Sequence, residues 1–325
     1  MYIWQVKNLI LLFFISFAAS TSAQDSSTVL NESPTFFNND TTGSLVNKKR
    51  LRFITGVHIT SYAGTMFALG QAWYKDYPRV PFQIFNDSKE WAQVDKVGHG
   101  WTAYNIAKYS SGMWSWTGLS RKRAVVLGGL SSIGYQTILE YLDAHSAEWG
   151  WSWTDMAANV GGTGVYVVQD LAWNEQRILF KFSSHKVVYE EELLRRADEL
   201  YGKTLPERIL KDYNGQTYWL SANIRSFAKE SRIPSWLNIA VGYGAKGLFG
   251  GFENRAVDAS GNTTFDRPDI LRQRQWYISP DIDFTRIKTD KKGLKVAFSV
   301  LNMIKLPAPA LELSGGKVRG RLFYF

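Results

Sequence analysis

The sequence lacks cysteine altogether. This absence excludes disulfides, thiolate zinc sites, iron–sulfur clusters and a cysteine nucleophile, and it removes the acylated cysteine that a bacterial lipoprotein requires. Motifs of common enzymes are missing as well, since no Gly-x-Ser-x-Gly elbow, Walker A loop or dinucleotide fingerprint occurs at a predicted strand-to-helix turn. The sequence therefore indicates no defined reaction and no cofactor.

Charge and hydrophobicity are close to globular averages, whereas aromatic residues are abundant. Charged residues make up 21% and hydrophobic residues 45% of the 325 positions, which fits neither wholesale disorder nor a polytopic membrane protein. The length suggests about two domains. Trp, Tyr and Phe reach 15%. Rings that carry one polar atom suit a membrane interface, a ligand groove or an all-β envelope protein.

Residues 1–23 have the pattern of a secretory signal peptide. Lys7 supplies a positive charge, residues 9–17 are apolar, and the small residues that end at Ala23 allow cleavage after it. The apolar run is shorter than the roughly 20 residues of a membrane-spanning helix. We therefore predict an exported protein in the periplasm, or associated with the outer membrane, of a diderm bacterium.

The predicted mature chain is basic. Without Lys7 it has 37 basic and 29 acidic residues, a net charge of +8. Because an exported protein meets little nucleic acid, this excess favours anionic lipid or polysaccharide surfaces, and the expected partner is an envelope lipid or another amphiphile. Residues 24–47 are polar and have no apolar period, which predicts a flexible leader before the fold.

Residues 48–213 are predicted to form an antiparallel helical bundle. Periodicity and capping residues predict helices over 53–74, 89–109, 121–143 and 152–173, then a strand at 178–182 and helices over 187–201 and 206–212. The segment 53–74 contains no charged residue. A buried bundle helix is favoured there over a helix that dips into a membrane, because Gly and Thr residues dilute its hydrophobicity.

Residues 214–325 are predicted to be a β-rich region. Aromatic and β-branched segments between turn residues predict strands over 216–224, 236–243, 273–284 and 317–325, with one helix over 291–304. Four or five strands fall short of the eight that a complete barrel needs. The predicted fold class is α+β, with an N-terminal antiparallel helical bundle followed by a small antiparallel β region.

Polar side chains recur at helical spacing in the predicted bundle. The pairs are Asp95 with His99, Glu140 with Asp143, and Asp155 with Asn159. Spacings of three and four place each pair on one helix face, and apolar neighbours suggest that some side chains point inward. If they converge, they form a polar cluster that suits a metal ion, a polar head group, a reaction, or structural hydrogen bonds and caps.

Structural hydrogen bonding is the favoured interpretation of this cluster. The paired Glu-x-x-His motifs of di-iron bundles and the His-Glu-x-x-His motif of zincins are both missing, so we predict no metal site. A second candidate patch consists of Trp149, Trp151 and Trp153. Because three exposed rings are costly, they are expected to pack over the bundle, to lie at a lipid interface or to line a groove, and packing is favoured.

Several segments resemble a known family. They are residues 94–99 (Val-Asp-Lys-Val-Gly-His), residues 140–143 (Glu-Tyr-Leu-Asp) and residues 152–162, which begin with Ser-Trp-Thr-Asp. These segments resemble the YfiM-like predicted periplasmic lipoproteins that form domain of unknown function 2279. Residues 211–221, 242–244 and 307–310 look like the longer version found in Bacteroidetes-type envelopes. The order of the polar residues is distantly similar to VanZ-like membrane proteins. None of these relatives implies an established reaction.

Two functions follow from these observations. The first is a non-enzymatic, membrane-associated envelope component that binds an amphiphile. The alternative is a hydrolase or transferase that acts on a lipid-linked envelope substrate through Asp95, His99, Asp143 and Asp155. A solvent-open cleft at His99 would favour the enzyme, and a closed core would favour the structural role.

Overall fold

The computed structural model describes residues 46–70, 78–258 and 260–324, so the predicted signal peptide and nearly all of the predicted leader lie outside the described residues. The chain divides into two compact units. The helical unit comprises the described residues of Met1–Asn86, Thr102–Gln176 and Thr285–Val300. The sheet unit comprises those of Asp87–Trp101, Arg177–Phe284 and Leu301–Phe325.

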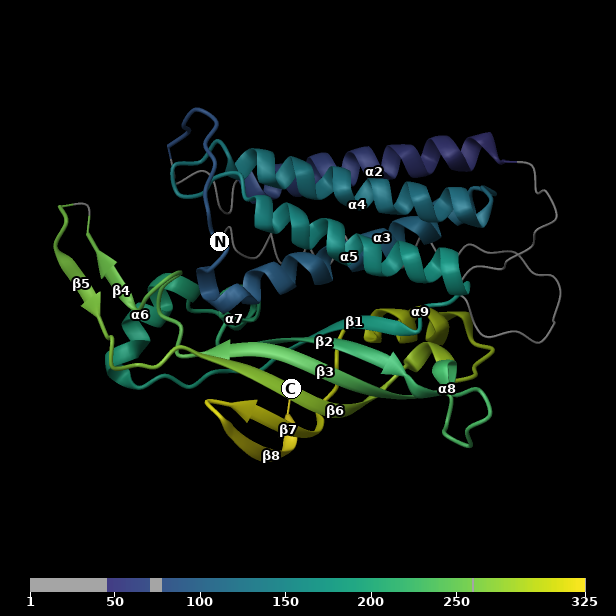
Figure 1. The fold of residues 1–325 in the computed structure, drawn as a ribbon. Coiled ribbons are helices and arrows are strands. Elements are labelled where there is room, and N and C mark those ends of the chain that lie inside the picture. The colour runs from purple at the N-terminus through teal and green to yellow at the C-terminus, as the bar shows by residue number, and fades with distance from the viewer. Residues whose placement is uncertain (1–45, 71–77, 259, 325) are drawn as a thin grey trace. The chain divides into compact units, whose positions relative to one another are not determined.

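Long helices build the helical unit (Figure 1). It contains α2 (Lys48–Leu69), α4 (Arg121–Asp143), α5 (Trp153–Trp173), most of α3 (Val94–Trp116) and most of α9 (Lys292–Leu301). Asn47 caps the start of α2, since its side chain accepts hydrogen bonds from the backbone N–H groups of Lys49 and Arg50, both at 3.0 Å. None of the described helices is both long enough and apolar enough to span a bilayer.

Adjacent glycines let α4 lie close to two neighbouring helices. A Cβ atom at Gly128 would lie 2.6 Å from the backbone nitrogen of Ser111 and 2.7 Å from the carbonyl oxygen of Ala107, both on α3. A Cβ atom at Gly129 would lie 2.9 Å from Val167 on α5. Because their side chains are single hydrogens, these two residues allow α4 to pack against α3 and α5 at short distance.

The sheet unit is built on a six-stranded antiparallel sheet (Figure 1). In spatial order its strands are β1 (Ile178–Ser184), β2 (Gln216–Asn223), β3 (Leu237–Lys246), β6 (Gln273–Ile282), β7 (Ala308–Ser314) and β8 (Lys317–Tyr324). Strands β4 (Arg255–Val257) and β5 (Thr263–Asp266) form a separate hairpin. The outer edge of β1 is hydrogen-bonded to residues 303–305, since Phe182 N–H donates to the carbonyl oxygen of Met303 at 2.9 Å.

Short helices complete the sheet unit. They are α6 (Glu191–Tyr201), α7 (Leu205–Lys211), α8 (Ile224–Phe227) and the 3-10 helix η2 (Glu90–Gln93), while the 3-10 helix η3 (Phe284–Arg286) lies where the two units join in sequence. Ala197 and Tyr201 of α6 are buried together with Phe249, and Trp91 packs against this cluster. The first two turns of α3, residues 94–101, also belong to this unit.

The predicted fold class is confirmed, because a helical bundle precedes an open antiparallel sheet. Several elements differ from the prediction, since α2 spans Lys48–Leu69 instead of 53–74 and the hairpin of β4 and β5 was not predicted. Helix α3 begins at Val94 instead of residue 89, because Trp91, Ala92 and Gln93 have positive φ angles of 48°, 51° and 64°. Strand β7 was not predicted at all. The predicted domain boundary between residues 213 and 214 stays a prediction.

Candidate functional site

Four of the six residues predicted to form a polar cluster lie in the helical unit, near the connection between α4 and α5. Glu140 and Asp143 are in the last turn of α4, and Asp155 and Asn159 are in the first two turns of α5. Glu140, Asp155 and Asn159 are buried, and Asp143 is half-buried. The four residues therefore lie at one end of the helix pair.

Hydrogen bonds hold the two helices together at this end. The backbone N–H of Ser152 donates to Glu140 Oε2 at 3.2 Å, and Gln136 Nε2 donates to Asn159 Oδ1 at 2.6 Å. Ser152 Oγ accepts the backbone N–H of Asp155 at 3.0 Å, which is the cap that the Ser-Trp-Thr-Asp segment predicts. Gln136 was not singled out from the sequence, although it lies one turn before Glu140.

The other two predicted residues, Asp95 and His99, lie in the sheet unit on the first two turns of α3. Asp95 Oδ2 accepts a hydrogen bond from Lys96 Nζ at 2.9 Å, and Lys96 also pairs with Asp87. Burial raises the pKa of Asp95 above its ordinary value, and the charges of Lys96 and His99 oppose this shift. Because the six predicted residues are divided between two units, their convergence into one cluster stays a prediction.

The tryptophans of the second candidate patch differ in exposure. Trp153, at the start of α5, is 65% exposed, whereas Trp149 and Trp151 are half-buried. The ring of Trp151 packs against Trp153 and Phe82, with centroid distances of 5.4 and 5.9 Å. The backbone of Trp151 is also hydrogen-bonded to Gln83, whose carbonyl oxygen accepts its N–H at 2.8 Å. Trp153 is thus the member of the patch that presents its ring to the surroundings.

The buried face of the six-stranded sheet carries charged side chains that the sequence analysis did not single out. Lys181 on β1 is fully buried, and its Nζ lies 2.7 Å from Asp281 Oδ2 on β6. Ser221 Oγ donates to the same oxygen at 2.6 Å, and Asn238 Nδ2 donates to Ser221 Oγ at 2.9 Å. The buried ion pair is stabilised by these additional hydrogen bonds, because a charge in a low-dielectric interior is costly without partners.

Aromatic contacts show that the sheet is strongly curled around this polar face. The rings of Tyr277 and Tyr324 stack with their centroids 4.1 Å apart. Thr217 Oγ1 on β2 lies 3.0 Å from the Tyr324 hydroxyl on β8, although β3, β6 and β7 separate these strands in the sheet. The buried Glu312 pairs with Arg321 Nη2 at 2.7 Å. The interior of the sheet is therefore a mixture of aromatic rings and paired charges.

The opposite face of the sheet is apolar, and much of it is exposed, although Phe180 and Tyr218 on this face are buried. The cross-strand row Leu220, Val241, Ile278 and Leu311 runs without interruption from β2 to β7, and these side chains are 46–57% exposed. The next row contains Tyr218, Tyr243, Trp276, Leu313 and Val318. Trp276, Leu313 and Val318 are exposed as well. A contiguous apolar surface of this kind marks a protein or membrane contact, because water solvates it poorly.

The helical unit also buries polar side chains and exposes large apolar ones. The inward faces of α4 and α5 bury Ser132, Gln136, Glu140, Asn159 and Gln169. Their exposed large side chains include Leu130 and Ile138 on α4 and Val160, Val168 and Leu171 on α5. Both units therefore bury many polar side chains beside their apolar core clusters, and both expose many large apolar side chains.

The sequence comparisons give a family for the segment that carries the predicted cluster. Residues 84–170 match the family described as "Predicted periplasmic lipoprotein (DUF2279)". The DUF2279 segment comprises 87 of the 325 residues, from the residues before η2 to the last turn of α5, and it contains all six residues of the predicted polar cluster. No curated protein and no solved structure matches the chain.

The match confirms the resemblance to domain of unknown function 2279, and the family description agrees with the predicted localisation. The chain is thus an exported protein of the cell envelope, periplasmic or membrane-associated. The distant similarity to VanZ-like proteins is not supported by the match and stays a prediction. The lipid anchor of the family's description is not carried over, because the acylated residue of a bacterial lipoprotein is a cysteine and this sequence has none. The family description assigns no reaction.

Proposed function

We propose that this protein is a non-enzymatic envelope component whose sheet unit lies with its exposed apolar face against the acyl chains of a membrane. The observation that carries this proposal is the row Leu220, Val241, Ile278 and Leu311, four aliphatic side chains about half exposed on adjacent strands. Complete burial of such a side chain contributes about 1.5–3 kcal/mol, and because each is already about half buried, contact with lipid supplies about half of this free energy.

A lipid contact fits the rest of this face better than a water-filled environment does. Tyr243 and Trp276 lie side by side in the adjacent row, with ring centroids 4.7 Å apart. Amphipathic rings of this type are enriched where membrane hydrocarbon meets water. The backbone groups inside the sheet are paired with neighbouring strands, as contact with hydrocarbon requires.

Vesicle flotation tests the proposal. The full mature chain is mixed with vesicles of zwitterionic phosphatidylcholine, which isolates apolar contact from charge attraction. The double variant Val241→Glu, Ile278→Glu should bind at least about tenfold more weakly, because carboxylates on this face have to be desolvated on contact. Val188→Glu is the matched control, since Val188 is 86% exposed in the same unit but lies outside the sheet.

The control should bind as the wild-type chain does. Circular dichroism and thermal melting establish that all three proteins are folded. Equal binding by the double variant and the control, or absence of wild-type binding, would remove the support for an apolar contact through this face.

A further inference from the structure

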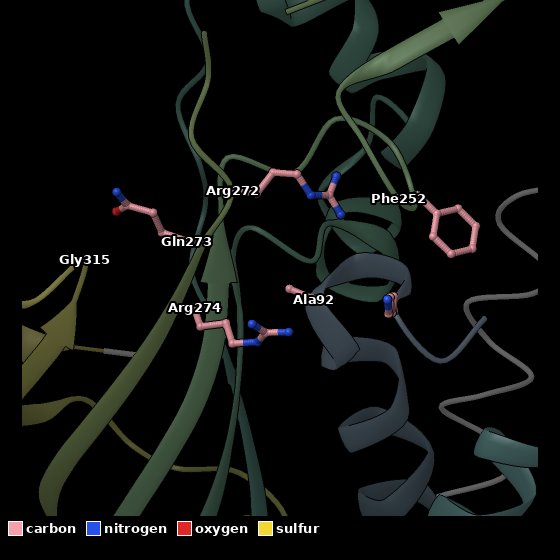
Figure 2. A pocket seen from close by; sticks show the side chains of 7 residues that line it. Ala92, Phe252, Arg272, Gln273, Arg274 and Gly315 are labelled. Carbon is pink, nitrogen blue, oxygen red and sulfur yellow. The ribbon is translucent and has the colours of Figure 1, made fainter. Parts of the chain in front are cut away.

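A basic pocket lies in the sheet unit beside the start of strand β6. Its volume is about 420 Å³, and it is lined by Lys89, Ala92, Phe252, Arg272, Gln273, Arg274 and Gly315 (Figure 2). Three of these residues are cationic and none is acidic. Within the part of the chain that the structure describes, none of the three cations forms an ion pair. Their charge is therefore available to a ligand.

The two arginines are held in place by uncharged partners. Arg272 donates through Nη1 to the carbonyl oxygen of Gly250 at 2.6 Å and through Nη2 to that of Gly251. Arg274 donates through Nε to the Tyr243 hydroxyl at 3.2 Å and through Nη2 to Gln93 Oε1 at 2.6 Å. Each guanidinium has five N–H donors, so both retain donors and a full charge. Figure 2 shows both side chains extending to the same side of β6, whereas Gln273 extends to the other side.

Neighbouring carboxylates do not cancel this charge. Glu90 and Glu253 are near enough to raise the pKa of Arg272, although burial is the larger effect and lowers that pKa. Neither Glu90 nor Glu253 is among the residues that line the pocket. The lining thus keeps an excess of positive charge, with two guanidinium groups preorganised by hydrogen bonds.

The wall of the pocket that contains Ala92 is conformationally unusual. Trp91, Ala92 and Gln93 are three successive non-glycine residues with positive φ, a conformation that costs on the order of 1–3 kcal/mol per residue. Tertiary contacts hold the turn, since Trp91 N–H donates to the carbonyl oxygen of Gly251 at 2.7 Å and the Tyr243 hydroxyl donates to that of Ala92. The turn is thereby fixed against Gly251 and Tyr243, which are themselves hydrogen-bonded to Arg272 and Arg274.

The pocket is continuous with the apolar face of the sheet. Arg274, Trp276 and Ile278 alternate along β6 and therefore share one face. Tyr243, which accepts a hydrogen bond from Arg274, is the cross-strand partner of Trp276. Along β6, this face therefore presents first the cationic pocket, then the ring pair of Tyr243 and Trp276, and then the aliphatic row that contains Ile278.

We infer that the pocket formed by Lys89, Arg272 and Arg274 binds a phosphate-type anion, and that the phosphate of a lipid head group occupies it when acyl chains lie on the aliphatic row. Guanidinium forks match the geometry and charge of phosphate oxygens. The lipid part of this inference rests on the proposed function, whereas anion binding by the pocket does not.

Two probes separate the sources of the phosphate. The first is isothermal titration of the full mature chain with glycerol 1-phosphate at millimolar concentration. The second is flotation with vesicles of phosphatidylcholine that contain phosphatidylglycerol. Wild-type binding in each assay is compared with Lys89→Gln, Arg274→Gln and their double variant. Arg272 is left intact because it holds the 250–251 segment. Lys229→Gln is the matched control, an exposed lysine in the same unit that does not line the pocket.

We expect the double variant to lose at least about tenfold in affinity and the control to stay within about twofold of the wild type. If the double variant loses affinity both for glycerol 1-phosphate and for the phosphatidylglycerol vesicles, a lipid head group is supported as the source of the phosphate. If it loses affinity for glycerol 1-phosphate alone, a soluble phosphate is supported. Binding that is insensitive to Lys89 and Arg274, or no binding of either probe, overturns the inference. Phosphatidylcholine also carries a phosphate, but its choline cation leaves the head group without net charge. The double variant should therefore lose at most about twofold with pure phosphatidylcholine vesicles, where binding depends on the aliphatic row, so a failure of the pocket is distinguishable from a failure of the apolar contact.

Discussion

At the scale of single residues, the interior of the sheet concentrates charge where most domains place hydrocarbon. Lys181, Asp281 and Lys305 are all buried on this face. The ammonium group of Lys305 lies 4.7 Å from the centroid of the Trp219 ring. Burial lowers the pKa of Lys305 from 10.5 to about 8, with Asp281 opposing the shift and Lys181 adding to it. Asp281 forms its ion pair with Lys181, at 2.7 Å, and acts on Lys305 through its charge.

Lys305 therefore gives the stability of the protein a defined pH dependence. Its pKa is depressed in the folded state, so between pH 8 and pH 10.5 the unfolded chain holds a proton that the folded chain has released. The free energy of unfolding should rise with pH through this window. Denaturant melts from about pH 7 to about pH 9.5 measure the slope and avoid the tyrosines, whose pKa of 10.0 in the unfolded chain would reverse the trend at higher pH.

Lys305→Met should flatten this dependence and stabilise the protein at neutral pH, since the side chain keeps its length but no longer has to be desolvated as a cation. A slope that persists unchanged in the variant would show that another group titrates in this range.

At the scale of secondary-structure elements, the sequence predicted correctly those features that depend on residues close together in the chain. Helix α4 was predicted over 121–143 and spans Arg121–Asp143, and the cap at Ser152 was predicted from four residues of sequence. Strand β7 was missed because Pro307 and Pro309 argue against a strand. Proline is tolerated at 309 because the pairing with β8 is irregular between Ala308 and Ala310, where a backbone donor is not needed.

The cap of α5 gives a direct test. Ser152→Ala should lower the free energy of unfolding by about 1 kcal/mol, because the backbone N–H of Asp155 loses its acceptor. Ser120→Ala is the matched control, since Ser120 precedes α4 without a side-chain cap hydrogen bond and its removal should cost less than about 0.5 kcal/mol. If urea melts show the same loss of unfolding free energy for both variants, the Ser152 hydroxyl contributes nothing as a cap.

The packing of α4 gives a second test at this scale. Gly128→Ala should destabilise the protein by about 1–3 kcal/mol, because its Cβ would meet the backbone of α3. Gly134→Ala, on the same helix, has open space around the added Cβ and should stabilise by up to about 1 kcal/mol through helix propensity. Thermal melts that shift in the same direction for both variants would contradict this account of the helix interface.

At the scale of the whole molecule, the location of the protein in the cell envelope agrees with the distribution of its exposed apolar side chains. An exported envelope protein meets lipid, and apolar side chains about half exposed on several strands and helices suit that environment. The signal peptide that directs export lies outside the described residues and stays a prediction. Sequencing of the envelope-bound protein should find Gln24 as the first residue, because small residues precede it up to Ala23. An intact Met1 in a cytosolic fraction would contradict both processing and export.

The sequence by itself determined the fold class, the envelope address, the spans of α4 and α5, and the position of the Ser152 cap, because periodicity, caps and the family's motifs are short-range features of the chain. Only the tertiary structure decided which face of each strand is buried. Alternation along β3 or β6 separates Val241 and Ile278 from Ala240 and Ser279, but it does not say which set faces inward. The ion pair between Lys181 and Asp281, 100 residues apart, and the pocket that joins Lys89 to Arg274 arise from long-range strand pairing and chain reversal, which no local pattern specifies.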